Sequence, residues 1–127
     1  MDDCIFCKIA NGNILAKKIY ENEYVYAFLD ASPKGKGHTL VIPKAHFENI
    51  YDVNEKVLCD IYTVVKKLSI HLKKKLNCGG ITIVQNNEEI GGQSVFHLHV
   101  HILPKYEVEE NDYDMDELWK LLSIEEL

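Results

Sequence analysis

The sequence predicts an α+β fold, in which one long helix packs on a five-stranded antiparallel sheet and a short helix lies near the C-terminus. Runs of residues with strand character outnumber the helical stretches. The connections between these runs are short, which favours antiparallel pairing because a parallel pair needs a long crossover. One stretch, from about Asn54 to Leu76, has the apolar period of an amphipathic helix.

The first three strands are predicted in the N-terminal part of the chain. Residues 19–30 contain two short strand-like runs around a polar turn at Glu21 to Glu23. A turn-rich segment, residues 32–37, interrupts this pattern. Residues 38–42 form the third strand, and Pro43 ends it because proline cannot donate a hydrogen bond to a sheet.

The long helix is predicted from its apolar stripe, whose members recur at spacings of three and four residues while the lysines lie mostly off it. Asp52 and Glu55 resemble a capping box at its start, and Gly79-Gly80 supplies a stop signal at its end. The stripe consists of Val57, Leu58, Ile61, Val64, Val65, Leu68, Leu72 and Leu76.

Two further strands and a short helix are predicted after the long helix. Residues 81–85 form the fourth strand and residues 86–92 a loop. Residues 95–103 form the fifth strand, closed by Pro104. Residues 114–126 predict a shorter helix, with the apolar side chains of Leu118, Trp119, Leu121 and Leu122.

The composition is that of one globular domain, residues 1–127, with 46% hydrophobic and 27% charged residues. A net charge of -6 argues against broad binding to nucleic acid or to anionic membranes, since both need a positive surface. The first residues, Met1-Asp2-Asp3-Cys4, are acidic, and no apolar run long enough for a signal peptide or a membrane span follows them. A cytoplasmic location is therefore expected. The four cysteines, Cys4, Cys7, Cys59 and Cys78, are then expected to stay reduced.

Three alternate histidines carry the strongest functional signal. On a strand over residues 95–103, the period of two places His97, His99 and His101 on one face, ~6.6–6.8 Å apart along the strand. The other face is apolar and is predicted to join the core, with Phe96, Leu98, Val100 and Ile102. Such histidines suit different roles around one phosphate, although strand curvature could bring two of them to one metal.

A glycine-containing loop precedes the histidines. In Gly91-Gly92-Gln93-Ser94 the glycines let the backbone approach a ligand, while backbone N–H groups and the Ser94 hydroxyl can donate to phosphate oxygens. Two glycines before a strand are more often a simple turn, and a solvated polar face could hold histidines by chance. The glycine loop, however, lies directly before the three histidines, and this combination favours an anion-binding site beside a nucleophile.

The stretch from Gly91 to Ile102 closely resembles the signature of the histidine triad (HIT) nucleotide-binding family, Hint-like branch. The resemblance extends to residues 4–9, 28–33 and 38–46, in the family's order and spacing. It implies a HIT-like fold with a domain core over residues 4–105. The tail, residues 106–127, has only weak resemblance and contains an acidic run.

The resemblance implies a catalytic role for five residues. His99 would be the nucleophile, which takes a nucleoside monophosphoryl group and is then freed by water. The backbone carbonyl of His97 would hold the Nδ1 proton of His99, and His101 would contact the phosphate. Ser94 would hydrogen-bond the phosphate or the leaving group, and His38 would support the other histidines.

The resemblance also implies the nucleotide-binding residues. Asp30 would accept hydrogen bonds from both ribose hydroxyls, although an aspartate at a strand end is by itself unremarkable in this position. Around the phosphate, Asn86, Gly92, Gln93, Ser94, His99 and His101 are expected. The base pocket is expected to be lined by Ile5, Phe6, Ile9, Phe28 and Leu29, hydrophobic walls that discriminate little between adenine and guanine.

A structural zinc site is also expected. Cys4 and Cys7 resemble half of a tetrahedral site. In family members with this cysteine pair, the remaining ligands correspond here to His46 and His97. Such a site would fix His97 and the strand that presents His99, while the chemistry itself would need no cofactor. Cys59 and Cys78 are expected to be packing residues.

The expected activity is hydrolysis of the P–N bond in purine nucleoside 5'-phosphoramidates through a nucleotidyl-histidine, as in an adenosine 5'-monophosphoramidase. Three alternatives stay open: a dinucleoside polyphosphate hydrolase with the same histidine chemistry, a nucleotide-binding regulatory module without turnover, and a metal hydrolase using the three histidines as an open zinc site. The family resemblance also implies a homodimer, with the long helix and residues 81–85 at the interface.

Overall fold

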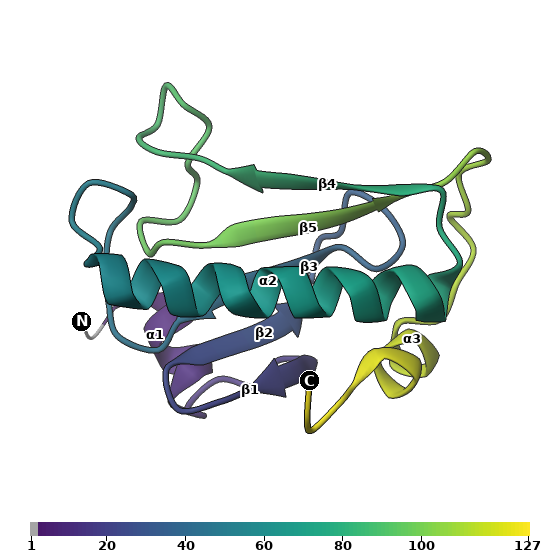
Figure 1. The fold of residues 1–127 in the computed structure, drawn as a ribbon, viewed down its shortest axis with the longest axis horizontal. Helices are drawn as coiled ribbons and strands as arrows, with labels where there is room; N and C mark the ends of the chain where they lie inside the picture. Colours follow the sequence, from purple (N-terminus) through teal and green to yellow (C-terminus); the bar gives the residue numbers. More distant parts are fainter. Residues whose placement is uncertain (1–2) are drawn as a thin grey trace.

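The computed structural model describes residues 3–127, so the acidic start at Met1 and Asp2 lies outside the described residues. Figure 1 shows a sheet with one long helix lying across it. In chain order the elements are α1 (Ile5–Ala10), β1 (Lys18–Glu21), β2 (Val25–Leu29), β3 (Thr39–Pro43), α2 (Glu55–Leu76), β4 (Gly80–Gln85), β5 (Val100–Lys105) and α3 (Met115–Leu122).

The five strands form one sheet in the order β1-β2-β3-β5-β4, and each neighbouring pair is antiparallel. This confirms the predicted fold class. The register places Tyr26 opposite Ile42 in the first half and Ile83 opposite Ile102 in the second. The strand order makes β3 the middle strand, with β5 beside it, and β4 forms one edge (Figure 1).

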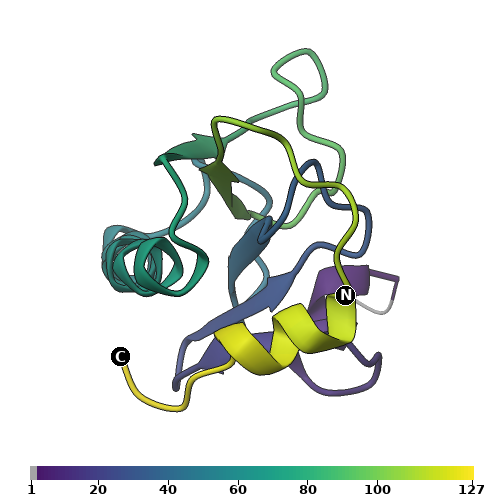
Figure 2. The same cartoon turned by 90° about the vertical axis from the view of Figure 1, so that its right-hand side faces the viewer.

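The two faces of the sheet bury two different apolar clusters. Figure 2 shows α2 on one face and α1 on the other. Along β2, Val25, Ala27 and Leu29 pack in the cluster that contains the α2 stripe, while Tyr26 and Phe28 pack with α1. Because successive side chains of a strand point to opposite faces, both sides of β2 are buried.

Both signals predicted for the ends of the long helix were misplaced. The N-cap is Asn54, whose side chain accepts from the Val57 N–H, whereas the Asp52 carboxylate accepts from the N–H groups of Glu48 and Asn49. At the other end Asn77 adopts a left-handed conformation with φ 51°, so the helix ends before Gly79. Gly80 already belongs to β4.

The fifth strand is shorter at its start than predicted, because β5 begins at Val100 where pairing with β4 ends. His97 and His99 therefore lie in the segment ahead of the strand. There the Leu98 N–H donates to the Phe47 carbonyl, at 2.7 Å, rather than to a neighbouring strand. Phe96, predicted on the core face, is 44% exposed as a result, while Pro104 lies inside β5 opposite Ile81.

The ends of the chain differ from the expected pattern. α1 was not predicted, and α3 ends at Leu122 rather than at residue 126. Asp114 caps α3 by accepting from the N–H groups of its first turn. Among the described residues, no helix combines the length and the apolar character needed to cross a bilayer.

Candidate active site

His38, His99 and His101 form a connected cluster on the α1 side of the sheet. His38 Nε2 lies 2.9 Å from His101 Nδ1, and the ring centroids of His99 and His101 are 4.9 Å apart. Phe6 of α1 packs edge-on against His99, with ring centroids 5.2 Å apart. His38 and His99 are buried, with 1% and 5% exposure.

Backbone groups determine which nitrogen of each histidine carries a proton. A carbonyl can only accept, so His99 Nδ1 donates to the His97 carbonyl, at 2.8 Å, and its Nε2 keeps a free lone pair. A backbone N–H can only donate, so His38 Nδ1 accepts from Lys34, at 3.1 Å. His38 Nε2 then donates to His101 Nδ1, and His101 Nε2 carries a proton that can be given to a ligand.

Burial keeps these histidines neutral. Desolvation lowers the pKa of His99 below its ordinary value of 6.5, against the opposing effect of the hydrogen bond to His97. Desolvation also lowers the pKa of His38, and it lowers that of His101 to about 4, helped by the neighbouring histidines. A neutral imidazole with a free Nε2 is the nucleophilic form of histidine.

Asp30 follows β2 and lies beside this cluster. Its Oδ1 accepts from the Ser32 N–H at 2.9 Å, and its Oδ2 lies 3.6 Å from His38 Nε2. The backbone N–H of Asp30 donates to the His38 carbonyl, at 3.0 Å, which fixes the strand end against His38. The carboxylate keeps acceptor capacity on both oxygens.

The loop before the histidines is held by the side chain of Gln93. Its Nε2 donates to the carbonyls of Glu48 and Val95, and its Oε1 accepts from Asn49 Nδ2 and from the Glu88 N–H. Gln93 is 2% exposed, and the hydrogen bonds of its side-chain amide are made to protein groups that hold the loop in place. Ser94, the next residue, is exposed.

Two glycines allow this loop to fold tightly. A side chain at Gly91 would overlap the carbonyl of Asn87, and Gly92 has a φ of 97°, a conformation that favours glycine. A Cβ at Gly92 would meet the side-chain amide of Asn86 at 3.4–3.5 Å. Asn86 and Gly92, both predicted to contact phosphate, thus lie next to each other.

Cys4, Cys7, His46 and His97 form a second group, and their ligand atoms all lie within 4.8 Å of one another. Cys7 Sγ lies 3.3 Å from His46 Nδ1, and Cys4 Sγ lies 3.3 Å from His97 Nδ1. Tetrahedral zinc with ordinary bond lengths separates sulfur and nitrogen ligands by about 3.5 Å. The spacing therefore fits a zinc ion.

The hydrogen bonding of His97 also fits a metal ligand. Its Nε2 donates to the Pro43 carbonyl, at 2.8 Å, so its Nδ1 presents a lone pair toward the cysteines. Burial lowers the pKa of His97 to about 4, which keeps the ring neutral, and burial raises the pKa of the Cys7 thiol to about 11. A bound cation would favour the thiolates.

Asp30, His38 and His101 also lie close enough to surround an ion. Their hydrogen bonds do not suit one, because a metal on His38 Nε2 would require a proton on Nδ1, where the Lys34 N–H already donates. This disfavours an open metal centre built on these histidines.

An apolar cavity of about 550 Å³ lies beside Asp30, since Leu29 and Ala31 on either side of it line the wall. Of the predicted base-pocket residues, Ile5, Ile9, Phe28 and Leu29 line this cavity. Phe6 instead contacts Phe28 and His99.

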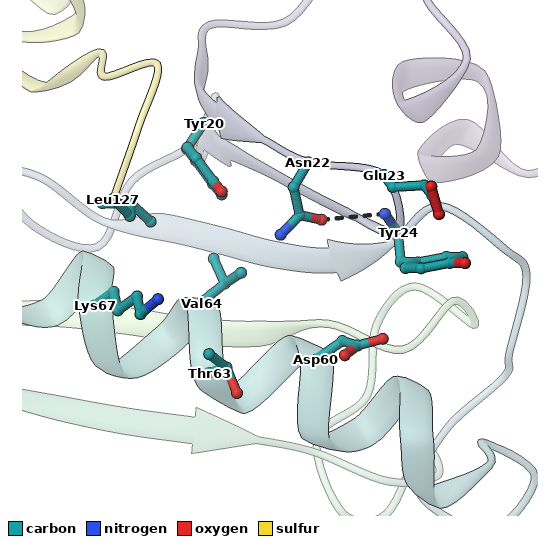
Figure 3. Close-up of a pocket in the computed structure, with 9 residues that line it drawn as sticks. All are labelled: Tyr20, Asn22, Glu23, Tyr24, Asp60, Thr63, Val64, Lys67 and Leu127. Carbon is teal, nitrogen blue, oxygen red and sulfur yellow. Dashed lines mark hydrogen bonds between the residues drawn. The ribbon is translucent and has the colours of Figure 1, made fainter.

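A different hollow, of about 290 Å³, lies between the β1–β2 turn and α2 (Figure 3). Its polar groups serve the turn and the helix: Asn22 Oδ1 accepts from the Tyr24 N–H, and Asp60 pairs with Lys56. It is bordered by α2, on the face of the sheet opposite to α1, and has no histidine in its wall. The cavity beside Asp30 is the better candidate for a ligand.

Several groups in this site carry no sequence signal of their own. The backbone N–H of Lys34 and the carbonyl of Pro43 set the tautomers of His38 and His97, and any residue type supplies such groups. Only the role of the His97 carbonyl was implied by the family resemblance. Met115 and Trp119 line the cavity from α3, which the apolar pattern predicted as a helix without indicating where it packs.

Comparisons with known proteins point to one family. The HIT domain family matches residues 11–108. An uncharacterised HIT-like protein of Methanocaldococcus jannaschii is 46% identical over 125 residues, covering 92% of this chain and 96% of the relative. Adenosine 5'-monophosphoramidase of Saccharomyces cerevisiae is 36% identical over 126 residues, covering 93% and 77% respectively.

A solved structure extends the comparison. A Zn-bound histidine triad family protein from Mycobacterium smegmatis aligns with a TM-score of 0.88 at 32% identity, covering 95% of this chain and 91% of that one. The match of the HIT domain to most of the sequence and the shared fold lead to one conclusion: the chain belongs to the HIT domain family.

Proposed function

We propose that this protein hydrolyses the P–N bond of purine nucleoside 5'-phosphoramidates through a nucleotide bound covalently to His99. The observation that carries the proposal is the hydrogen bond from His99 Nδ1 to the His97 carbonyl, which leaves Nε2 as a free nucleophile beside a donor, His101. The name of the yeast relative, an adenosine 5'-monophosphoramidase, supports the same reaction.

In the first step, His99 Nε2 attacks the α-phosphorus. A P–Nε2 bond forms, the bond from phosphorus to the substrate nitrogen breaks, and the released amine takes up a proton from solvent at the open side of the site, beside the exposed Ser94. The His97 carbonyl stabilises the Nδ1 proton as positive charge develops on the ring. His101 Nε2 donates to a phosphate oxygen, and Lys34 orients it through His38.

In the second step, water attacks the same phosphorus. A bond forms from the water oxygen to phosphorus and the P–Nε2 bond breaks, the attacking water gives its proton to solvent, and nucleoside monophosphate leaves while His99 returns to its neutral form with the proton on Nδ1. Asn86 and the backbone at Gly92 contact the phosphate in both steps, with Ser94 at the exposed side toward the leaving group. Gln93 acts by holding this loop.

The nucleoside is placed by Asp30 and the apolar cavity. The Asp30 carboxylate accepts hydrogen bonds from the ribose hydroxyls, and the base enters the cavity next to it, against Phe28 and Leu29. Apolar walls favour a large flat ring over water but distinguish purines from one another only weakly.

The proposal is tested by comparing hydrolysis of adenosine 5'-phosphoramidate with that of diadenosine polyphosphates. Preferential cleavage of the amide supports it. Preference for the polyphosphates would identify a dinucleoside polyphosphate hydrolase, and saturable binding of adenosine monophosphate without turnover of either substrate would identify a binding module.

The pH profile of the reaction is expected to lack a histidine titration at its ordinary position. Burial lowers the pKa of His38 and lowers that of His101 to about 4, with Asp30 opposing and Lys34 assisting the shift. Because a lowered pKa keeps the rings neutral in more acidic solution, the midpoint of the acid limb of kcat/KM should lie below pH 6.5. An acid limb centred at or above 6.5 would contradict this assignment.

Substitution of Asp30 by alanine is expected to lower kcat/KM for adenosine 5'-phosphoramidate roughly 10- to 100-fold, since it removes hydrogen bonds to a charged acceptor. The loss should shrink to about twofold for the 2',3'-dideoxy substrate, which has no ribose hydroxyls to donate. Steady-state kinetics on both substrates measure this difference. An equal loss on both would assign Asp30 to support of His38 instead.

We also propose that Cys4, Cys7, His46 and His97 hold a structural zinc ion. The distances and the tautomer of His97 support it, as does the name of the M. smegmatis structure. Zinc there would join α1 to the segment that carries His99, and would supply no chemistry to the reaction.

We propose further that two copies of the chain pair through α2 and β4. β4 is an edge strand with Ile83 40% exposed, and α2 carries Tyr62 and Ile70 at 40% and 50% exposure on its outer side. The unpaired backbone N–H and C=O groups of an edge strand can hydrogen-bond to a strand of a second chain, and exposed apolar side chains favour this association.

A further inference from the structure

The cavity beside Asp30 is closed on one side by the C-terminal helix. Met115 and Trp119 of α3 line it together with Phe28 and Leu29 of the sheet. Figure 1 shows α1 and α3 at opposite ends of β1 and β2, so the cavity extends between two helices that are distant in sequence. The match to the HIT domain ends at residue 108, before α3 begins.

Two contacts hold Trp119 against the start of β1 and the residue before it. Its Nε1–H donates to the Lys18 carbonyl, at 2.7 Å. The Lys17 ammonium lies 5.1 Å from the centroid of the indole and forms an ion pair with Asp116 of the same helix, at 2.6 Å. The indole is therefore held in one place by groups next to the cavity, and it offers a preformed aromatic surface.

The cavity and the ribose-binding carboxylate share one backbone segment. Leu29 and Ala31, which line the cavity, are the neighbours of Asp30. A nucleoside whose ribose is bound by Asp30 therefore directs its base into this cavity. A flat aromatic ring is best accommodated there by packing against apolar and aromatic side chains.

We propose that Met115 and Trp119 form the outer wall of the base pocket and bind a purine ring by packing. This inference rests on the proposed function, because it takes the ligand of the site to be a purine nucleotide. It assigns to α3, outside the matched domain, a direct role in substrate binding.

Trp119 itself provides the first test, because it is the single tryptophan of the chain. Titration with adenosine monophosphate should change its fluorescence, with a midpoint equal to the Kd measured by calorimetry. Ribose 5-phosphate, which has the sugar and phosphate but no base, should leave the fluorescence unchanged.

Variants give the second test. Trp119→Ala should raise the Kd for adenosine monophosphate and the KM for its phosphoramidate by roughly 5- to 150-fold, the range found when an aromatic partner of a base is removed. Met115→Ala should raise both in the same direction. Trp119→Phe keeps an aromatic wall and should restore most of the affinity, and kcat should be unchanged in all three.

Leu121→Ala is the matched control, since Leu121 lies on α3, is 44% exposed and does not line this cavity. Normal Kd and KM values are expected for it. If Trp119→Ala fails to fold, Met115→Ala and the fluorescence of the wild type still decide the question.

Two outcomes would overturn the inference, and they are distinguishable. Binding of adenosine monophosphate by calorimetry, with no change in Trp119 fluorescence and a Kd within about twofold of wild type in Met115→Ala and Trp119→Ala, would reject the role of α3 and leave the proposed function intact. Absence of any binding of adenosine monophosphate would reject both.

Discussion

Replacement of His99 by alanine is expected to lower kcat/KM for adenosine 5'-phosphoramidate by about 10³-fold or more, because it removes the atom that forms the covalent bond. Binding should persist, since Asp30 and the apolar cavity are untouched. The Kd for adenosine monophosphate is therefore expected to stay within a few-fold of wild type, and steady-state kinetics with calorimetry measure the two effects separately.

A direct observation of the intermediate would strengthen this result. Wild-type protein mixed briefly with substrate and quenched in denaturant should carry one nucleotide on the peptide that contains His99, as detected by mass spectrometry. His71→Ala is the matched control, because His71 lies on α2 and hydrogen-bonds the Leu122 carbonyl. An active His99→Ala variant, or an adduct at another residue, would refute His99 as the nucleophile.

Removal of zinc is expected to have the largest effect on stability. The proposed ligands join α1, the segment after β3 and the segment before β5, so the loss of the ion frees three parts of the chain at once. Structural zinc contributes several kcal/mol to folding, which corresponds to a fall in Tm of roughly 10 °C or more for a domain of this size. Activity should fall as well, because His97 positions His99.

The measurement combines metal analysis with calorimetry. The purified protein is expected to contain one zinc per chain, to lose stability in a strong chelator, and to regain it when zinc is restored. Cys7→Ser should reproduce the chelated state, whereas Cys59→Ser, at an exposed position on α2, should keep both zinc and Tm. An unchanged Tm after complete removal of the metal would exclude a structural role.

Much of the fold could be predicted because its elements have strong local periods. The alternation around residues 19–30 predicted two strands, and the stripe over residues 54–76 predicted the helix that packs on the sheet. The ends were less predictable, since Asp52 and Asn54 are both good capping residues. Only the packed chain shows that Asp52 instead accepts from the backbone at Glu48 and Asn49.

The start of the strand that carries the histidines was also poorly predicted from the sequence. A strict period of two placed Phe96 in the core, but the structure starts β5 at Val100 and leaves Phe96 44% exposed. The alternation continues ahead of β5 as far as His97, since Leu98 is buried in the core and His97 and His99 both pack against Phe6, and it fails only at Phe96. A pattern along one strand contains no information about where its partner ends.

The sequence by itself determined the fold class, the family motif and the residue types of the site: three spaced histidines, a glycine loop, and cysteines at the spacing of half a zinc site. The family resemblance implied a role for each of these residues, and the tertiary structure decided which ring nitrogens carry the protons that those roles require. His97 turns toward the cysteines because Pro43 accepts its Nε2 proton, and His101 becomes a donor because Lys34 orients His38. The reason is physical: a proton's position on an imidazole depends on backbone groups that folding brings from distant parts of the chain, and no local pattern encodes them.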